Sequence, residues 1–132
     1  MLRNIFSVVA GLLLGGAANM ALILLSPVII PPPEGFDFTT AEGLAAGMEF
    51  MEPKHFIMPF LAHAVGTLVG AFVAVKISKT DKMVIPMIIG AAFFAGGLSM
   101  VLDYPSPMWF NVLDLGLAYI PMALLGFRWA RS

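Results

Sequence analysis

The sequence predicts an all-α integral membrane protein that folds as a four-helix bundle in one domain over residues 1–132. Three features predict this class: 60% of the residues are hydrophobic, only 11% are charged, and the apolar residues gather in four long runs. Soluble domains carry about 25% charged residues, whereas a helix of about 20 apolar residues crosses the hydrocarbon core of a bilayer. The predicted spans are residues 4–30, 55–76, 83–102 and 108–127.

The first span carries a ridge of small residues, because Gly11, Gly15 and Asn19 follow one another at intervals of four. Helices in membranes pack closely along such ridges, and an amide at membrane depth hydrogen-bonds to a neighbouring helix. Asn19 is therefore expected either to join span 1 to another span or to belong to a polar pathway. Pro27 and the prolines at 31–33 end the helix, since proline lacks the backbone donor and clashes with the preceding turn.

Residues 31–54 form the longest loop. Thr39 and Glu42 have the spacing of a capping box, which predicts a short helix over about residues 40–51 that lies at the membrane interface. Acidic side chains outnumber basic ones in this loop, where Glu34, Asp37, Glu42, Glu49 and Glu52 stand against Lys54. Two interpretations are open: the acidic residues form a solvated face, or they form an acidic mouth that concentrates cations.

The second span is expected to be the central helix of the bundle. Ala62, Gly66, Gly70 and Ala74 recur at every fourth residue and form a packing ridge along which another helix can approach closely. His63 lies beside this ridge. A titratable group at membrane depth is costly unless it faces protein or water, so His63 is expected to face the inside of the fold.

The charges at the ends of the spans predict the orientation. Six of the seven basic residues fall on one side of the membrane, and Lys54 falls on the other; the six are Arg3, Lys76, Lys79, Lys82, Arg128 and Arg131. The turn between spans 2 and 3, which holds three of these lysines, also contains Asp81. Because basic residues stay on the cytoplasmic side, both termini are expected in the cytoplasm and the acidic loop outside.

A weak internal match indicates a possible duplication. A shift of 80 residues aligns residues 16–27 with 96–107, and a shift of 51 aligns 58–63 with 109–114, which sets His63 over Asp114. Under this hypothesis the two halves are parallel hairpins related by an axis along the membrane normal, an arrangement known from transporters.

The polar residues of the spans gather in the outer half of the predicted bundle. His63 and Asp114 lie at nearly equal depth by the rise of a helix, and Asn111 lies one turn above Asp114. The candidate ligand-binding residues are His63, Asp114, Asn111, Asp103, Tyr104, Asn19, Ser99, His55 and Glu52. Two interpretations are open: a buried His–Asp pair that only fixes helix register, or a pocket that binds a small solute or ion.

The sequence predicts no cofactor and no metal. Carboxylate and imidazole side chains such as Glu52, His55 and His63 suit zinc, iron or manganese, but Pro53 directly after Glu52 makes Glu52 a residue that starts a helix. The chain has no cysteine, and its net charge of −1 argues against nucleic acid as a partner. A metal-dependent membrane enzyme is therefore the third of three hypotheses, and no catalytic residue is assigned.

The motifs PPPEG (31–35) and EPKHF (52–56), together with the span that contains Asp114, resemble small four-span bacterial inner-membrane proteins of unknown function. The resemblance covers nearly the whole chain and implies a location in the bacterial inner membrane. It brings no activity. The chain does not resemble small fluoride channels, nor small multidrug exporters, which carry a glutamate in the first span where this chain has Asn19.

The leading hypothesis is a multi-pass membrane protein that binds or transports a small solute or ion in a polar pocket around His63 and Asp114. The alternative is a structural or accessory subunit whose His–Asp pair only stabilises helix packing. The expected partners are the lipid bilayer, an unidentified small ligand, and a second copy of the chain or another membrane protein, because four short spans enclose little space by themselves.

Overall fold

A computed structural model describes residues 1–80 and 82–132, so Asp81 of the predicted basic turn lies outside the described residues. The described chain is helical and contains no strand. Four stretches are long and apolar enough to cross a membrane, which confirms the predicted class. The helices are α1 (Leu2–Ile29), α2 (Ala41–Met48), the short 3₁₀ helix η1 (Pro53–Phe56), α3 (Ile57–Ile77), α4 (Val84–Asp103), α5 (Met108–Leu117) and α6 (Ile120–Arg131).

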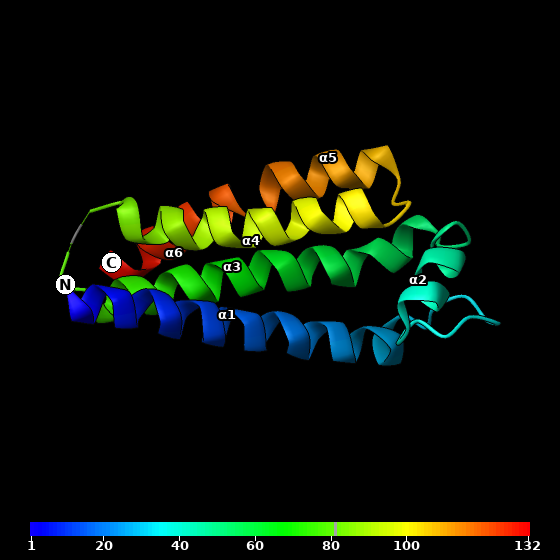
Figure 1. Cartoon of the computed structure of the whole chain (residues 1–132), viewed down its shortest axis with the longest axis horizontal. Coiled ribbons are helices and arrows are strands. Elements are labelled where there is room, and N and C mark those ends of the chain that lie inside the picture. The colour runs from blue at the N-terminus through cyan, green and yellow to red at the C-terminus, as the bar shows by residue number, and fades with distance from the viewer. Residues whose placement is uncertain (81) are drawn as a thin grey trace.

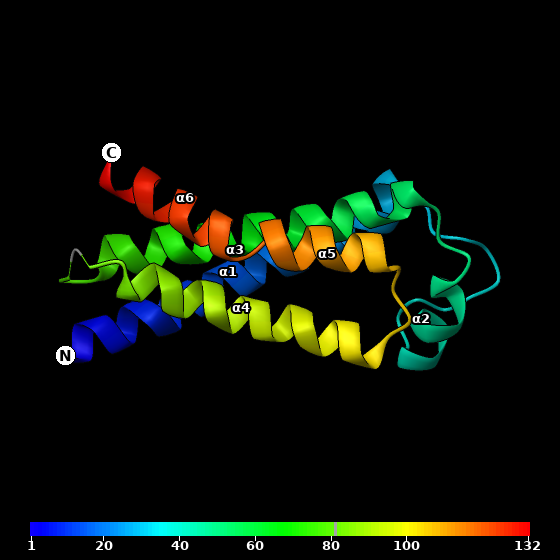
Figure 2. The ribbon, with the colours of Figure 1, turned by 90° about the horizontal axis from the view of Figure 1, so that it is seen from above.

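Helix α3 lies at the centre of the bundle, as the sequence predicts (Figure 1). Helix α1 runs beside it over its full length, and α4 and α6 pack against its other faces. Both chain ends lie at the same end of the bundle, while α2 and its loop lie across the opposite end (Figure 2). The fold therefore has one closed end that carries the termini and one end that is covered by α2 and the loop before it, which we call the cap.

The ridge of small residues on α3 packs against α1 of the same chain. Ala62 and Ala74 have no exposed surface, and Gly66 and Gly70 are buried. A Cβ atom on Gly15 would lie 2.5 Å from the carbonyl oxygen of Gly66 and 2.9 Å from the Cα of Gly70. The two ridges are thus the two faces of one contact inside the chain, where small residues let the helix backbones approach.

The half of the bundle near the termini is filled by apolar side chains. Ala71, Ile85, Ile89 and Ala123 form a buried cluster there. Helix α6 approaches α3 closely at Gly126, where a Cβ atom would lie 2.6 Å from the carbonyl oxygen of Leu68. This packing closes the bundle at the end that carries both termini.

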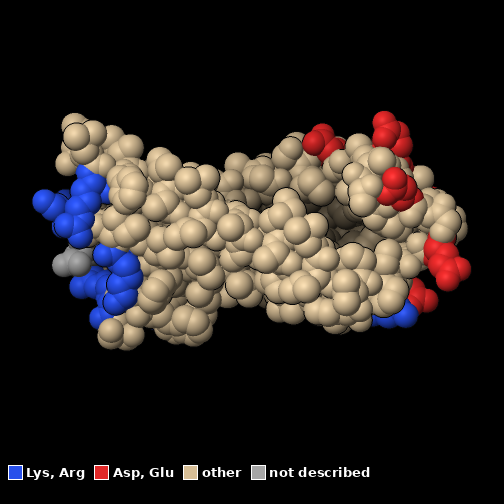
Figure 3. Space-filling model, turned by 90° about the horizontal axis from the view of Figure 1, so that it is seen from below, with Lys and Arg blue, Asp and Glu red and all other residues tan. Residues whose placement is uncertain are grey.

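Charged side chains lie at the two ends of the molecule. On the face that Figure 3 shows, lysines and arginines gather at the end with the termini, and acidic residues gather at the capped end beside one basic residue. We call the half of the bundle that carries the termini the basic half and the half under the cap the acidic half. An uncharged surface between two charged ends is typical of a membrane-spanning bundle, because charge at membrane depth is costly.

The fourth span was predicted as one helix over residues 108–127, but it consists of two helices. Helix α5 ends at Leu117, and α6 begins at Ile120 and continues to Arg131. Pro121 has no backbone N–H, so the carbonyl of Leu117 lacks a donor four residues later. The two residues at the break, Ala118 and Tyr119, are both buried, and this break positions the polar site described below.

The cap is formed by the loop after α1 and by α2. The interfacial helix was predicted over about residues 40–51, and the observed helix covers only Ala41–Met48. Met48 packs against Phe56 and Phe110 and so attaches the cap to the bundle. The cap therefore rests on apolar side chains of η1 and α5.

The predicted capping box at Thr39 is wrong by one residue. The N-cap of α2 is Thr40, whose hydroxyl accepts a hydrogen bond from the N–H of Gly43 at 3.0 Å. The hydroxyl and the backbone N–H of Thr39 instead donate to Asp37 Oδ1. These two hydrogen bonds favour the ionised carboxylate and lower the pKa of Asp37 below its usual value.

The possible duplication is not supported by the structure. Helices α1 and α3 pack together along their length, whereas α4 has far less contact with α5 and α6. The second span is also continuous, with η1 leading directly into α3, while the fourth span is broken.

Candidate functional site

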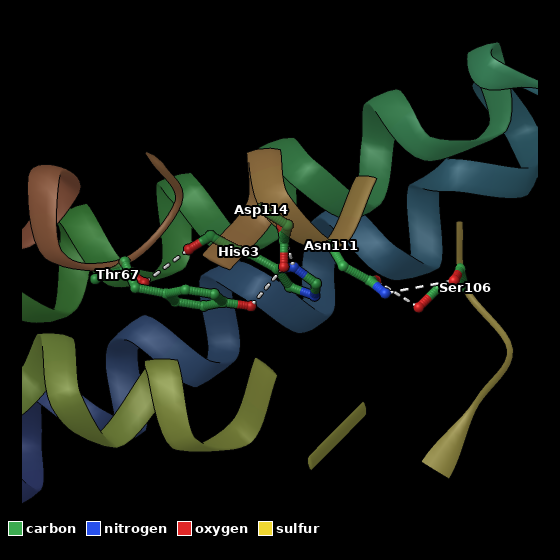
Figure 4. Close-up of polar contacts among 6 residues, drawn as sticks. His63, Thr67, Ser106, Asn111 and Asp114 are labelled. Atoms are coloured by element: carbon green, nitrogen blue, oxygen red, sulfur yellow. Dashed lines mark hydrogen bonds and ion pairs between the residues drawn. The ribbon is translucent and has the colours of Figure 1, made fainter. Parts of the chain in front are cut away.

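His63, Asp114 and Tyr119 form a hydrogen-bonded cluster inside the bundle, and Figure 4 shows His63 beside Asp114. Nδ1 of His63 lies 2.8 Å from Oδ1 of Asp114. The hydroxyl of Tyr119 donates to Oδ2 of Asp114 at 2.9 Å, and its ring stacks on the imidazole of His63 with 5.8 Å between the ring centroids. The pairing of His63 with Asp114 that equal depth predicts is present, and Tyr119 is a third member that sequence analysis missed.

The break in the fourth span brings Tyr119 to this cluster. Asp114 lies near the end of α5, and Tyr119 lies five residues later, just before α6. Because the backbone leaves the helical path between α5 and α6, the tyrosine side chain can return to the carboxylate. Gly97 of α4 provides the space, since a Cβ atom there would overlap the Tyr119 hydroxyl.

The hydrogen bonds of the cluster leave one imidazole nitrogen without a partner in the described part of the chain. The side chain of Asp114 is only 4% exposed, and each of its oxygens accepts a hydrogen bond from the chain, as a buried carboxylate requires. The side chain of His63 is 21% exposed. Its Nδ1 is held by Asp114, and its Nε2 has no hydrogen-bond partner among the described residues.

A cavity of about 680 Å³ adjoins this cluster in the acidic half of the bundle. Its wall is built from α1 and α4, the start of α3, one face of α5 and the cap with α2, and most of the lining side chains are apolar. Figure 3 shows the hollow on the side of the molecule next to the acidic cap. Small-molecule sites have volumes of about 300–1,000 Å³ and apolar walls with a few polar groups, so this cavity has the character of a ligand site.

Five of the predicted candidates line the cavity: His55, His63, Tyr104, Asn111 and Asp114. Ser106, which sequence analysis did not single out, lines it too and fixes Asn111. Its hydroxyl donates to Asn111 Oδ1 at 2.5 Å, and Asn111 Nδ2 donates to the carbonyl of Ser106 at 3.3 Å. Asn111 therefore lies along the cavity wall away from the His63 ring, as Figure 4 shows.

The other four candidates do not line the cavity. Ser99 and Asp103 lie on the exposed surface of α4, where the serine hydroxyl donates to the carboxylate at 3.3 Å. Asn19 lies in the contact between α1 and α3, with its Cβ close to Gly66. Its Oδ1 is buried and has no partner among the described residues, so this oxygen does not make the interhelical hydrogen bond that was one of the two expectations for Asn19. Glu52 caps η1.

Glu52 and His55 form a reciprocal cap at the start of η1 and α3. The backbone N–H of Glu52 donates to Nδ1 of His55 at 2.8 Å. Because Nδ1 accepts, the proton of the neutral ring lies on Nε2, which donates to the carbonyl of Pro31 at 3.0 Å. His55 thus ties the loop after α1 to η1, which leads into α3. The described residues contain no group of three His, Asp or Glu side chains placed to hold a metal ion.

Comparison of the chain with protein-family models, with curated proteins and with solved structures found no match.

Proposed function

We propose that this multi-pass membrane protein binds a small molecule in the cavity of its acidic half, with His63 as the polar contact. The observation that carries the proposal is the hydrogen bonding of the His63 ring at the cavity wall, because only one of its two nitrogens is held by another side chain of the described residues. Asp114 holds Nδ1 at 2.8 Å, and Nε2 has no partner among the described residues. Asp114 and Tyr119 are positioning residues, because they orient the imidazole and need not touch the ligand.

The lining supports an organic solute more than a bare ion. Most of the wall is apolar, and the two oxygens of Asp114 already accept hydrogen bonds from His63 and Tyr119. A hard cation is held by several oxygen ligands at once. An organic molecule needs only apolar contact and one or two hydrogen bonds to fix its orientation.

We further propose that the protein transports the bound molecule across the membrane. The basic half is filled by the cluster that contains Ala71, Ile89 and Ala123. Release on that side would therefore require a second conformation in which α6 or α4 moves away from α3, as in hinge or shear motions.

A structural role is the second candidate, and the complete hydrogen bonding of Asp114 favours it. Some buried ionic pairs have no role except to fix the register of the helices. In that case, well-packed apolar residues can replace both partners with little loss or even a gain in stability. The two candidates differ in what they require of the cavity: only ligand binding requires that a solute can reach it.

For the membrane setting, we propose that the basic half faces the cytoplasm and the acidic cap lies outside a bacterial inner membrane. The bias of six basic residues to one supports this orientation. Association with a second copy or with another membrane protein stays a prediction. The ridges of small residues on α1 and α3 do not argue for it, because they pack against each other inside the chain.

Single cysteines can test whether the cavity admits a solute, because the chain has no native cysteine. Ile23 and Leu25 lie at similar depth on α1, but Ile23 lines the cavity and Leu25 is an exposed residue outside its wall. In nanodiscs, Ile23→Cys should react with N-ethylmaleimide, a small uncharged reagent that can reach the cavity from water or from lipid. Leu25→Cys should not, because the thiolate is the reactive form and an apolar environment keeps the thiol protonated.

Equally low reactivity at the two positions would show that solutes do not reach the cavity and would contradict the proposal. Rapid reaction at Ile23→Cys alone would exclude a purely structural, sealed polar pair.

A further inference from the structure

The cavity opens on the side of the bundle, between α1 and α4. Leu24 of α1 and Met100 of α4 both line the cavity, yet they are 68% and 42% exposed, which places them at the edge of its opening. Helices α1 and α4 have little contact with each other, whereas α1 and α3 pack along their length. Figure 3 looks across the long axis of the bundle and shows the hollow on this side face.

An opening on the side of a membrane-spanning bundle faces lipid. The end of the cavity that would face water is covered by the cap, from which Phe36, Phe38, Leu44 and Met48 line the space. A molecule dissolved in the leaflet nearest the cap can therefore enter between α1 and α4 without passing the cap. The route favours a ligand that is itself soluble in the membrane.

The distribution of polar groups indicates an amphiphile with its polar group turned inward. The walls formed by α1 and α4 are mainly apolar, whereas α3 and α5 contribute His63, Asn111 and Asp114. The apolar walls of α1 and α4 suit a hydrocarbon chain, and the polar side chains of α3 and α5 suit a polar head group. Of these three residues, His63 has a ring nitrogen, Nε2, that lacks a partner among the described residues, so the head group is expected to hydrogen-bond there.

The charges around the cavity indicate that this head group is neutral. An anionic head would meet the carboxylate of Asp114 and the acidic cap. A cationic head would lose its hydration at membrane depth, which is costly, while Asp114 is already paired with His63 and Tyr119. A hydroxyl carries no charge and can donate to or accept from an imidazole nitrogen.

We propose that the occupant is an uncharged single-chain amphiphile with a hydroxyl head group, which enters from the lipid between α1 and α4 and places its hydroxyl at His63. The inference rests on the proposed function and adds the class of ligand and its route of entry.

Photoreactive probes that share one dodecyl diazirine chain test the ligand class. Their head groups are a hydroxyl, a carboxylate and a trimethylammonium group. In nanodiscs of zwitterionic lipid, the alcohol should label the cavity wall saturably, and unlabelled dodecanol should compete. The two charged probes should label it about tenfold less, a ratio that corresponds to about 1.4 kcal/mol in binding. Equal labelling by all three probes, or labelling that does not saturate, would overturn the inference.

Tryptophan substitutions test the route. Leu24→Trp and Met100→Trp should each slow labelling of the cavity wall by the alcohol probe, because each narrows the lateral opening from one side. Leu25→Trp is the matched control at the neighbouring, lipid-facing position and should leave the rate unchanged. Unchanged labelling in both opening variants would refute entry between α1 and α4.

The two proposals fail in different ways. If Ile23→Cys reacts with N-ethylmaleimide but the alcohol probe does not label the cavity saturably, the ligand class and route are wrong and the proposed binding function stands. If Ile23→Cys is unreactive, the proposed function itself fails.

Discussion

Replacement of Asp114 by alanine is expected to destabilise the protein strongly. The substitution removes two acceptors at once, the oxygen that pairs with His63 Nδ1 at 2.8 Å and the oxygen that accepts from the Tyr119 hydroxyl at 2.9 Å. Removing one partner of a buried ionic pair costs about 3–5 kcal/mol, and the side chain of Asp114 is only 4% exposed. We therefore expect Asp114→Ala to lower the free energy of unfolding by about 3–5 kcal/mol.

Two further variants separate the contributions. Asp114→Asn should cost less than Asp114→Ala, because the amide still offers an acceptor for His63 or Tyr119. Tyr119→Phe removes a single hydrogen bond to a charged group and should cost about 1.5–3 kcal/mol. Unfolding by titration with a denaturing detergent, followed by circular dichroism, measures all three. The reasoning is refuted if Asp114→Ala lies within about 0.5 kcal/mol of the wild type, the range of ordinary surface substitutions.

Three more predictions concern the contacts around the site. Gly15→Ala should be less stable than Gly16→Ala by about 1–3 kcal/mol in thermal unfolding. A Cβ at Gly15 would meet the carbonyl oxygen of Gly66 at 2.5 Å, whereas nothing lies within 4 Å of a Cβ at Gly16. Equal stability of the two variants would mean that α1 does not pack on α3 here. His55→Ala should speed hydrogen exchange in the cap, since it loses the hydrogen bonds to Pro31 and to the start of η1, and an unchanged exchange pattern would argue against this clamp. Asn19→Leu should not lower stability and can raise it by about 1–3 kcal/mol, because it removes a buried oxygen without a partner among the described residues; a loss would reveal a partner for this amide.

The parts of the fold that follow from distance along one helix could be predicted from the sequence. Four apolar runs define four spans, and the interval of four between small residues defines the face on which α3 packs. The pairing of His63 with Asp114 follows in the same way, because the rise per residue places them at equal depth. The pairing of Asn19 could not be predicted, since whether an amide finds a partner depends on which side chain faces it.

The break in the fourth span and the cavity depend on information that is not local. Pro121 is compatible both with the first turn of a new helix and with a continuous membrane helix that tolerates proline, so it does not specify a break. Gly97 leaves space for Tyr119, but this is visible only when α4 and α5 are placed side by side. The cavity exists because α1 and α4 separate towards the cap, and no residue spacing within either helix encodes that separation.

Nitrogen-15 NMR of the histidine side chains tests most directly the central claim that the cavity binds its ligand at His63. The chain has two histidines, so the spectrum of a His55→Asn variant assigns both rings. With the wild type in nanodiscs, titration with dodecanol should shift the Nε2 resonance of His63 in a saturable manner. The His55 signals should shift much less, because both of its ring nitrogens are already hydrogen-bonded within the chain, although this residue also lines the cavity. A His63 signal that does not move at saturating alcohol would contradict the account.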